Sequence, residues 1–190
     1  MNMKDIENEV RSCRKCELWK TRKNPVIGEG PIDTSIMLIG EAPGFNEDRL
    51  GRPFVGRAGN VLNEALFAIG LKRDDVYITN ILKCRPPGNR NPRLEEIEKC
   101  TPYLDRQVEI IKPRIICTLG NFALKYIFRK FGFTAEPVSK IHGKIFKSEN
   151  ITVIPMYHPA SAVYNPNLKQ IIINDFMKLK EVLNENSNTC

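Results

Sequence analysis

The sequence predicts an α/β fold built on a central sheet of four strands that is mainly parallel. Four short apolar runs have the length and composition of buried strands, and they cover residues 35–39, 76–82, 114–120 and 151–157. Amphipathic stretches with helical spacing separate these runs. Alternating strands and helices are typical of a parallel sheet with helices on both faces. We therefore expect one domain with a single core across residues 1–190.

Charge and cysteine content narrow the class of protein. The net charge of +7 favours a polyanionic partner, with nucleic acid the first candidate and a merely soluble basic protein the alternative. No apolar run is long enough to span a bilayer and the N-terminus is polar, so we expect a cytoplasmic protein without a membrane partner. In a reducing compartment the six cysteines are expected to be metal ligands or core residues instead of disulfides.

The first predicted element is a helix over residues 6–16, which ends in the Cys-x-x-Cys pair Cys13 and Cys16. A redox pair opens a helix after a strand, whereas this pair closes a helix with no strand ahead of it, so we favour a metal half-site. Cys84 and Cys100 supply a second, wider pair. Four thiolates suit either tetrahedral zinc or a [4Fe–4S] cluster, and spacing alone does not choose between them.

Two loops flank the first predicted strand. The polar stretch over residues 21–33 has a Gly-x-Gly at residues 28–30, but it precedes the strand, whereas a dinucleotide fingerprint follows one, so we expect a plain loop. Behind the strand, a turn rich in Gly and Pro covers residues 40–48 and carries Glu41 and Glu47. Open α/β sheets bind their ligands at the carboxyl ends of strands, so these two acids are candidate site residues.

Two further side chains are candidates for contact with a ligand. Phe54 lies in an ordered loop over residues 51–59, where it is either a plug for the core or a platform on which a flat base stacks. A helix with one apolar face follows over residues 61–69. Asn80 comes near the end of the second strand, and its amide is expected to cap a loop or to face the edge of a base.

The segment over residues 83–93 is the most basic and least periodic part of the chain. Its four cations are Lys83, Arg85, Arg90 and Arg93. They are expected to contact phosphates, and a solvated charged loop is the alternative. Asn91 and Pro92 are expected to open the next helix, with Leu94 on its buried side.

The rest of the chain completes the alternation. Helices are expected over residues 121–131 and 167–184, a hairpin or irregular region over 134–149, and a frayed tail over 185–190. Cys117 is expected to be a core residue and Cys190 an exposed spare in the tail. His158 follows the fourth strand, so Glu41, Asn80 and His158 come from three strand ends that meet at one edge of the sheet.

Taken together, the motifs resemble those of family 4 uracil-DNA glycosylases, the iron–sulfur enzymes of thermophilic archaea and bacteria. The matching stretches are Gly40-Glu41-Ala42-Pro43-Gly44 with Glu47-Asp48, Gly51-Arg52-Pro53-Phe54-Val55-Gly56, Asn80, Lys83-Cys84-Arg85-Pro86-Pro87-Gly88-Asn89-Arg90 and His158-Pro159. The resemblance covers nearly the whole chain. It implies a three-layer α/β/α fold and a structural [4Fe–4S] cluster on the four cysteines named above, with zinc as the alternative.

The resemblance also implies a role for each matching site residue. Phe54 would stack on a flipped uracil, Asn80 would read its O4 and N3–H edge, and His158 would bond to O2 and stabilise the leaving uracil anion. The loop backbone from Glu41 through Ala42 and Pro43 to Gly44 would hold the base from the other side. Other uracil glycosylases carry an aspartate at the position of Ala42 and a tyrosine at that of Gly44. Water activation and thymine exclusion are therefore expected from Glu41 or Glu47.

For DNA binding, the resemblance points to the basic loop and to the segment after the histidine, which consists of Ser161, Ala162, Val163 and Tyr164. Family members usually carry a leucine wedge where this chain has Ala162, so Val163 or Tyr164 is expected to fill the gap left by the flipped base. The expected partner is uracil-containing DNA, single- or double-stranded, bound by a monomer, with a sliding clamp as a further candidate partner. A metal-stapled DNA-binding module without catalysis, or a glycosylase for a wider set of deaminated bases, are the alternatives.

Overall fold

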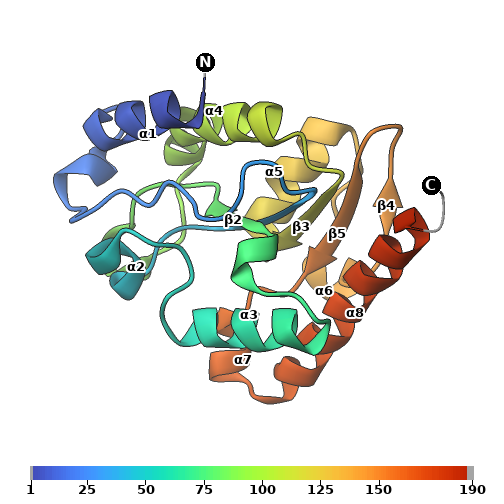
Figure 1. Cartoon of the computed structure of the whole chain (residues 1–190). Coiled ribbons are helices and arrows are strands. Elements are labelled where there is room, and N and C mark those ends of the chain that lie inside the picture. The colour runs from blue at the N-terminus through green and yellow to red at the C-terminus, as the bar shows by residue number, and fades with distance from the viewer. Residues whose placement is uncertain (1, 188–190) are drawn as a thin grey trace.

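The computed structural model describes residues 2–187, so Cys190 and the end of the predicted tail lie outside the described residues. Its sheet has five strands in the order β2-β1-β3-β5-β4. Four are parallel, namely β1 (Ile36–Gly40), β2 (Tyr77–Asn80), β3 (Ile115–Leu119) and β5 (Thr152–Met156). They match the four predicted runs, and the α/β class with a mainly parallel sheet is confirmed (Figure 1).

The prediction of four strands is wrong by one. The added strand is β4 (Phe146–Lys147), which pairs antiparallel with β5 at the edge of the sheet. It lies in the region predicted as a hairpin or irregular, together with the one-turn helix α6 (Val138–Ile141). A strand of two residues is too short to show the alternation of apolar and polar residues that identifies strands.

Helices cover both faces of the sheet, which gives the three expected layers. One face carries α1 (Met3–Ser12), α4 (Leu94–Ile111) and α5 (Asn121–Phe131), and the other carries α3 (Arg57–Ala68), α7 (Ala160–Tyr164) and α8 (Asn167–Ser187) (Figure 1). Successive strand side chains enter opposite layers, as in β1, where Met37 and Ile39 join the first core and Leu38 joins the second. Cys117 is buried in the second core, as predicted.

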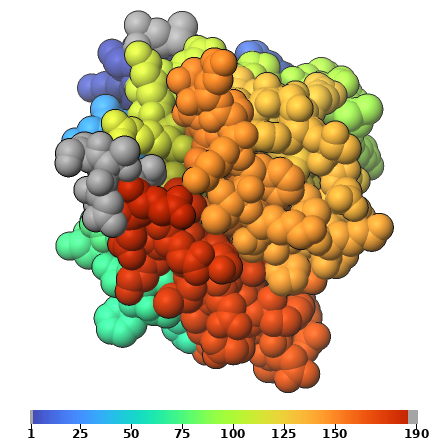
Figure 2. All heavy atoms as spheres, turned by 90° about the vertical axis from the view of Figure 1, so that its right-hand side faces the viewer, coloured from blue at the N-terminus to red at the C-terminus, as the bar shows by residue number. Residues whose placement is uncertain are grey.

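The side of the molecule that carries β4 is closed by α8. Figure 2 shows α8 in red against the orange segment that holds α6 and β4. His142 Nδ1 lies 3.0 Å from the carboxylate of Asp175 on α8, and Lys147 pairs with Glu185 at 3.1 Å. These contacts connect the segment that contains the edge strand to α8, a helix much later in the chain.

Two details of the helices differ from the predictions. Leu94 is 68% exposed, so this first residue of α4 does not lie on the buried side of the helix. A short helix, α2 (Phe45–Leu50), follows the Gly- and Pro-rich turn and was not predicted. In residues 2–187 no helix has both the length and the apolar character needed to cross a membrane.

Candidate active site

A cavity of about 550 Å³ opens at the carboxyl ends of β1, β2 and β5. The chain passes from β1 to β2 on one side and then crosses from β2 to β3 on the other side of β1, so the cavity lies at a switch point of the sheet. The five predicted side chains Glu41, Glu47, Phe54, Asn80 and His158 all line it. The loop residues Ala42, Pro43 and Gly44 line it as well. The structure therefore brings together the residues that the sequence placed at separate strand ends.

Asn80 is buried in the floor of this cavity with one polar atom unused. The residue is 2% exposed, and its Oδ1 has no hydrogen-bond partner among the described residues. Gly40 lies beside it in the parallel ladder, and a Cβ there would be 2.4 Å from Asn80 Oδ1 and 2.7 Å from Phe54 Cζ. A glycine is therefore needed where the amide meets the ring. A buried acceptor without a donor costs about 1–3 kcal/mol, which a ligand N–H would recover.

His158 is held as a neutral imidazole. Its Nδ1 accepts a hydrogen bond from the Ala160 backbone N–H at 3.0 Å, so the proton of the neutral ring is on Nε2. Burial lowers the pKa of His158 to about 4, and the nearby Glu47 carboxylate opposes this shift without cancelling it. The ring stacks on Phe54 with centroids 5.5 Å apart and an angle of 27° between the planes. At neutral pH the histidine therefore offers one uncharged N–H donor.

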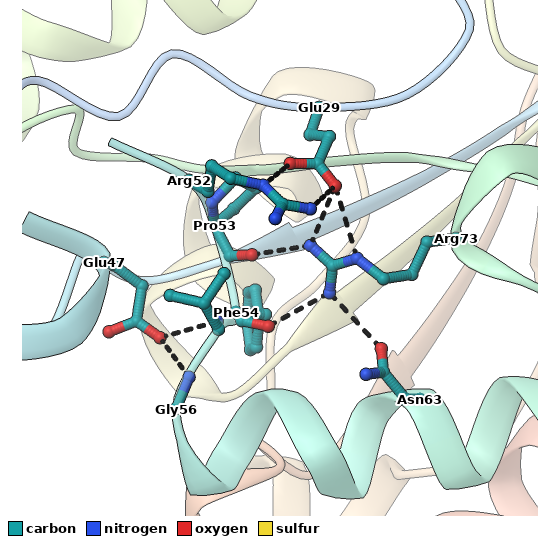
Figure 3. Close-up of polar contacts among 9 residues, drawn as sticks. Glu29, Glu47, Arg52, Pro53, Phe54, Gly56, Asn63 and Arg73 are labelled. Carbon is teal, nitrogen blue, oxygen red and sulfur yellow. Dashed lines mark hydrogen bonds and ion pairs between the residues drawn. The ribbon is translucent and has the colours of Figure 1, made fainter. Parts of the chain in front are cut away.

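The loop that carries Phe54 has a strained backbone conformation. Phe54 has φ of 50°, in the left-handed region, which costs a residue with a Cβ about 1–2 kcal/mol. The first turn of α3 lies directly against it, because a Cβ on Gly59 would be 1.9 Å from the Phe54 carbonyl oxygen. Glu47 Oε1 accepts the next two backbone N–H groups, those of Val55 at 2.9 Å and Gly56 at 3.1 Å (Figure 3).

The opposite side of the same loop is bound by Arg73. Its guanidinium donates to the carbonyl oxygen of Pro53 at 2.6 Å and to that of Phe54 at 3.0 Å (Figure 3). Glu29 Oε1 lies 3.4 Å from Arg73 Nη2, and Glu29 Oε2 pairs with Arg52 Nε at 2.6 Å. Hydrogen bonds from Arg52, followed by the charge of Arg73, hold the pKa of Glu29 below its usual range.

Sequence reasoning missed Glu29 and Arg73, although one signal was present. The Gly-x-Gly at residues 28–30 is a loop, as predicted, but Glu29 forms a bridge with Ile78 of β2. A Cβ on Gly30 would lie 2.1 Å from the Val76 carbonyl oxygen, so the glycine permits this close approach. A Gly-x-Gly beside a strand can thus indicate a backbone packed against the sheet. No pattern in the sequence points to Arg73.

The two candidate acids have different environments. Glu41 is half-buried, and desolvation raises the pKa of its carboxyl group. Glu47 is anchored by the two loop N–H groups through one oxygen. Its other oxygen, Oε2, lies 2.8 Å from where a Cβ of Gly44 would be. Glu47 therefore fills the space beside Gly44 and has a defined orientation at the cavity wall.

The four predicted ligand cysteines line one small cavity between α1, α4 and the start of the basic loop. Two of their sulfurs already accept hydrogen bonds, Cys84 from Arg22 at 3.0 Å and Cys100 from the Lys83 backbone N–H at 3.2 Å. Burial raises the pKa of the Cys100 thiol to about 12. Within residues 2–187 no three Cys, His, Asp or Glu side chains stand close enough together to form a metal shell as placed. The donor set and the N–H···S bonds nevertheless fit a thiolate-bound metal or cluster.

Lys83 is not a DNA contact, and this prediction is wrong. The side chain is 1% exposed, and its Nζ donates to Thr79 Oγ1 at 2.6 Å, the Asn80 carbonyl at 2.8 Å and Gln107 Oε1 at 2.7 Å. Three acceptors satisfy all three donors of an ammonium group. Desolvation lowers the pKa of Lys83 to about 7. In the sequence, an isolated lysine inside a basic segment looks the same whether it faces solvent or the core.

The other predicted cations lie at or near the rim of the cavity. Arg85 rests against the ring of Phe45, 5.3 Å from its centroid, and Phe45 is 52% exposed. Arg90 pairs with Glu96 at 2.6 Å, which offsets its charge. Arg93 is exposed immediately before α4.

The segment after His158 forms α7 at the same rim. Ser161 Oγ donates to the His158 carbonyl oxygen at 2.6 Å and so fixes the turn that follows the histidine. Ala162 is the residue of α7 that faces the core, and its burial contradicts its predicted contact with DNA. Val163 is partly buried, whereas Tyr164 is 86% exposed and lines the cavity.

These features define a class of site. An uncharged N–H donor, an unpaired amide and an aromatic ring meet at the strand ends of an α/β sheet. Such a cavity suits a flat, neutral, polar ring such as a nucleobase, and a basic rim suits its phosphates. The comparison with known proteins agrees, because the family described as "Uracil DNA glycosylase superfamily" matches residues 27–183. The chain belongs to this superfamily, and within it to the type-4 uracil-DNA glycosylases.

The similar proteins span nearly all of the chain. A type-4 uracil-DNA glycosylase of Sulfurisphaera tokodaii is 52% identical over 95% of this chain and 84% of its own length. One of Saccharolobus solfataricus is 50% identical over 96% of this chain and 87% of its own. One of Archaeoglobus fulgidus is 48% identical over 95% of this chain and 93% of its own.

Proposed function

We propose that this chain excises uracil from DNA by hydrolysing the bond between the base and the deoxyribose, with the flipped base bound in the cavity at the strand ends. Family membership supports the reaction. The observation that carries the assignment of the site is the buried Asn80 amide, whose Oδ1 lacks a partner in the described residues, beside a neutral His158. Unstacking the base costs a few kcal/mol, which these contacts offset.

In this proposal Asn80 recognises the edge of the base. Uracil presents an acceptor at O4 and a donor at N3, and a carboxamide offers the complementary donor and acceptor. Thymine has the same edge, so it has to be excluded by the wall near its 5-methyl group. We assign this wall to Glu47, whose carboxylate fills the space beside Gly44. Glu41 is the alternative.

His158 stabilises the leaving group. As the bond breaks, negative charge develops on the base, and the Nε2–H donates to O2 at that stage. A neutral donor favours the anion over neutral bound uracil, so it stabilises the transition state more than the ground state. Removing one such donor typically costs about 10²–10³ in rate.

The sugar carries the matching positive charge, and a carboxylate has to orient the attacking water. Glu41 and Glu47 both line the cavity. Glu47 has the fixed orientation that a water-binding group needs, while burial makes Glu41 easier to protonate. We therefore assign the orientation of the attacking water to Glu47. Glu41→Gln and Glu47→Gln distinguish the two, since the larger loss of rate identifies the acid that acts.

The four cysteines would hold a [4Fe–4S] cluster, with zinc as the alternative. Bound there, the group would act as a staple between α1, the basic loop and α4, and it would supply no step of the reaction. Arg85 and Phe45 on one rim and Tyr164 on the other would hold the DNA, with Tyr164 filling the gap left by the flipped base. We expect the enzyme to act as a cytoplasmic monomer, and a sliding clamp stays a candidate partner.

A cleavage assay tests the proposal. The purified protein is expected to create alkali-labile sites in an oligonucleotide with one uracil and none in a thymine control. Hypoxanthine and xanthine oligonucleotides measure the breadth of the specificity. Binding of the uracil oligonucleotide without release of the base, by protein with its full metal content, would contradict the proposal.

A further inference from the structure

We propose that Arg73, held by Glu29, is a positioning residue for the aromatic ring that stacks on the base. It acts by fixing the left-handed conformation of Phe54. The inference rests on the proposed function, because it concerns how the uracil platform is held. Arg73 comes from the segment between α3 and β2 and does not line the cavity itself.

The contacts form a clamp on three consecutive peptide groups, those that join residues 53 to 56. Arg73 donates to the carbonyl oxygens of Pro53 and Phe54, at 2.6 and 3.0 Å. Glu47 accepts the N–H groups of Val55 and Gly56 from the other side (Figure 3). A cation on the carbonyls and an anion on the amides fix the direction of the chain at Phe54.

The guanidinium is itself prevented from moving. Its side chain is 18% exposed, and Glu29 Oε1 lies 3.4 Å from both its Nε and its Nη2. Glu29 is in turn fixed by its backbone bridge to Ile78 of β2 and by the ion pair with Arg52. The clamp therefore fixes the position of the loop relative to the sheet that carries Asn80.

The clamp matters for the ring because Phe54 is in a conformation that a phenylalanine does not favour. In the relaxed conformation its side chain would leave the place where it contacts both Gly40 and His158. A displacement of about 1 Å at a reacting centre costs about 10²-fold in rate. The arginine touches neither base nor sugar, so its effect has to pass through the ring.

The test is a double-mutant cycle of Arg73→Met and Phe54→Ala, measured as kcat and KM on a uracil oligonucleotide. We expect Arg73→Met alone to lower kcat/KM by about 10- to 100-fold and to weaken inhibition by free uracil. In the Phe54→Ala background the same change should cost less than about threefold, since no ring is left to position. Asn63→Ala is the matched control, because it removes a 3.3 Å contact of Arg73 that does not involve the loop.

An equal factor in both backgrounds, or unchanged inhibition by uracil, would show that Arg73 only stabilises the fold and would overturn the inference. If Arg73→Met does not fold, Arg73→Lys takes its place, because an ammonium keeps the charge for Glu29 but lacks the planar fork that reaches both carbonyls. Wild-type kinetics of that variant would equally contradict the inference. Failure of the proposed function is a separate result, since it requires that the wild-type protein release no uracil.

Discussion

At the scale of single residues, the site depends on two side chains that carry no charge. The Asn80 amide is buried with a free acceptor, and the proton of His158 is placed on Nε2 by the Ala160 N–H. Burial keeps the imidazole neutral, so the site carries no positive charge on this ring before the bond breaks. Selectivity for the transition state then follows from one donor whose partner gains charge as the bond breaks.

The role of His158 can be tested by truncation. We expect His158→Ala to lower kcat on a uracil oligonucleotide by about 10²–10³-fold, because one donor to the developing anion is lost. DNA affinity, measured by fluorescence anisotropy on an uncleavable analogue, should stay nearly unchanged. A parallel loss of affinity and rate would instead assign the histidine to DNA binding.

The low pKa of His158 also predicts how stability depends on pH. Its pKa is about 4 in the folded protein and about 6.5 in the unfolded chain, so between these values the unfolded state binds more protons. The free energy of unfolding should therefore gain a contribution as pH rises from about 4 to 6.5, and lose it on acidification.

This contribution is measured by urea unfolding of the wild type and of His158→Gln. We expect the difference in free energy between the two proteins to change in favour of the wild type from about pH 4.5 to about pH 7. Subtracting the variant removes the titration of the other groups. A difference that is independent of pH would mean that the imidazole is not held neutral by the fold.

At the scale of elements, strand ends and loops supply the chemistry, while helices fix the loops. The Phe54 loop leads directly into α3, and its position depends on Gly59 within the first turn of that helix. The cysteines connect α1 with the basic loop and α4, which lie far along the chain from α1. Stability of this layer should therefore depend on the group that the cysteines hold.

We expect Cys84→Ser to lower both the Tm and the metal content of the purified protein, because metal binding is coupled to folding. Iron and zinc analysis with differential scanning calorimetry measures the two effects and identifies the metal. Cys117→Ala is the control, since Cys117 is buried in the core on the other face of the sheet. This control should keep the full metal content. An unchanged Tm and metal content in Cys84→Ser would refute the assignment of this cysteine.

The first residue of α2 is expected to contact DNA. Phe45 is 52% exposed at the rim of the cavity, beside Arg85 and with Lys23 Nζ 6.0 Å from its centroid. Stacking of a base on an aromatic side chain is worth about 1–3 kcal/mol, so Phe45→Ala should raise KM by about 10-fold with little change in kcat. Phe67→Ala is the matched control, because Phe67 is 82% exposed on α3 and does not line the cavity. Equal effects of both substitutions would argue against a specific contact.

At the scale of the whole molecule, the sequence predicted the parallel sheet, its helical layers and the cavity residues at the strand ends. The sheet and the helical layers follow from repeated patterns of apolar residues, which report burial directly, and Glu41, Asn80 and His158 were found because they end such apolar runs. It did not predict β4, the burial of Lys83 or the partner of the Phe54 loop. β4 is too short to show a strand pattern, although its partner β5 follows within a few residues. The other two depend on contacts between separate elements, Lys83 with Gln107 and Arg73 with Pro53, which no local pattern records.

A crystal structure of the protein with free uracil bound would show directly whether Asn80 and His158 bind the base. We predict that N3 of uracil lies about 3 Å from Asn80 Oδ1 and that O2 lies about 3 Å from His158 Nε2, with the ring against Phe54. Uracil bound in the cavity with Asn80 and His158 directed away from the base would contradict it.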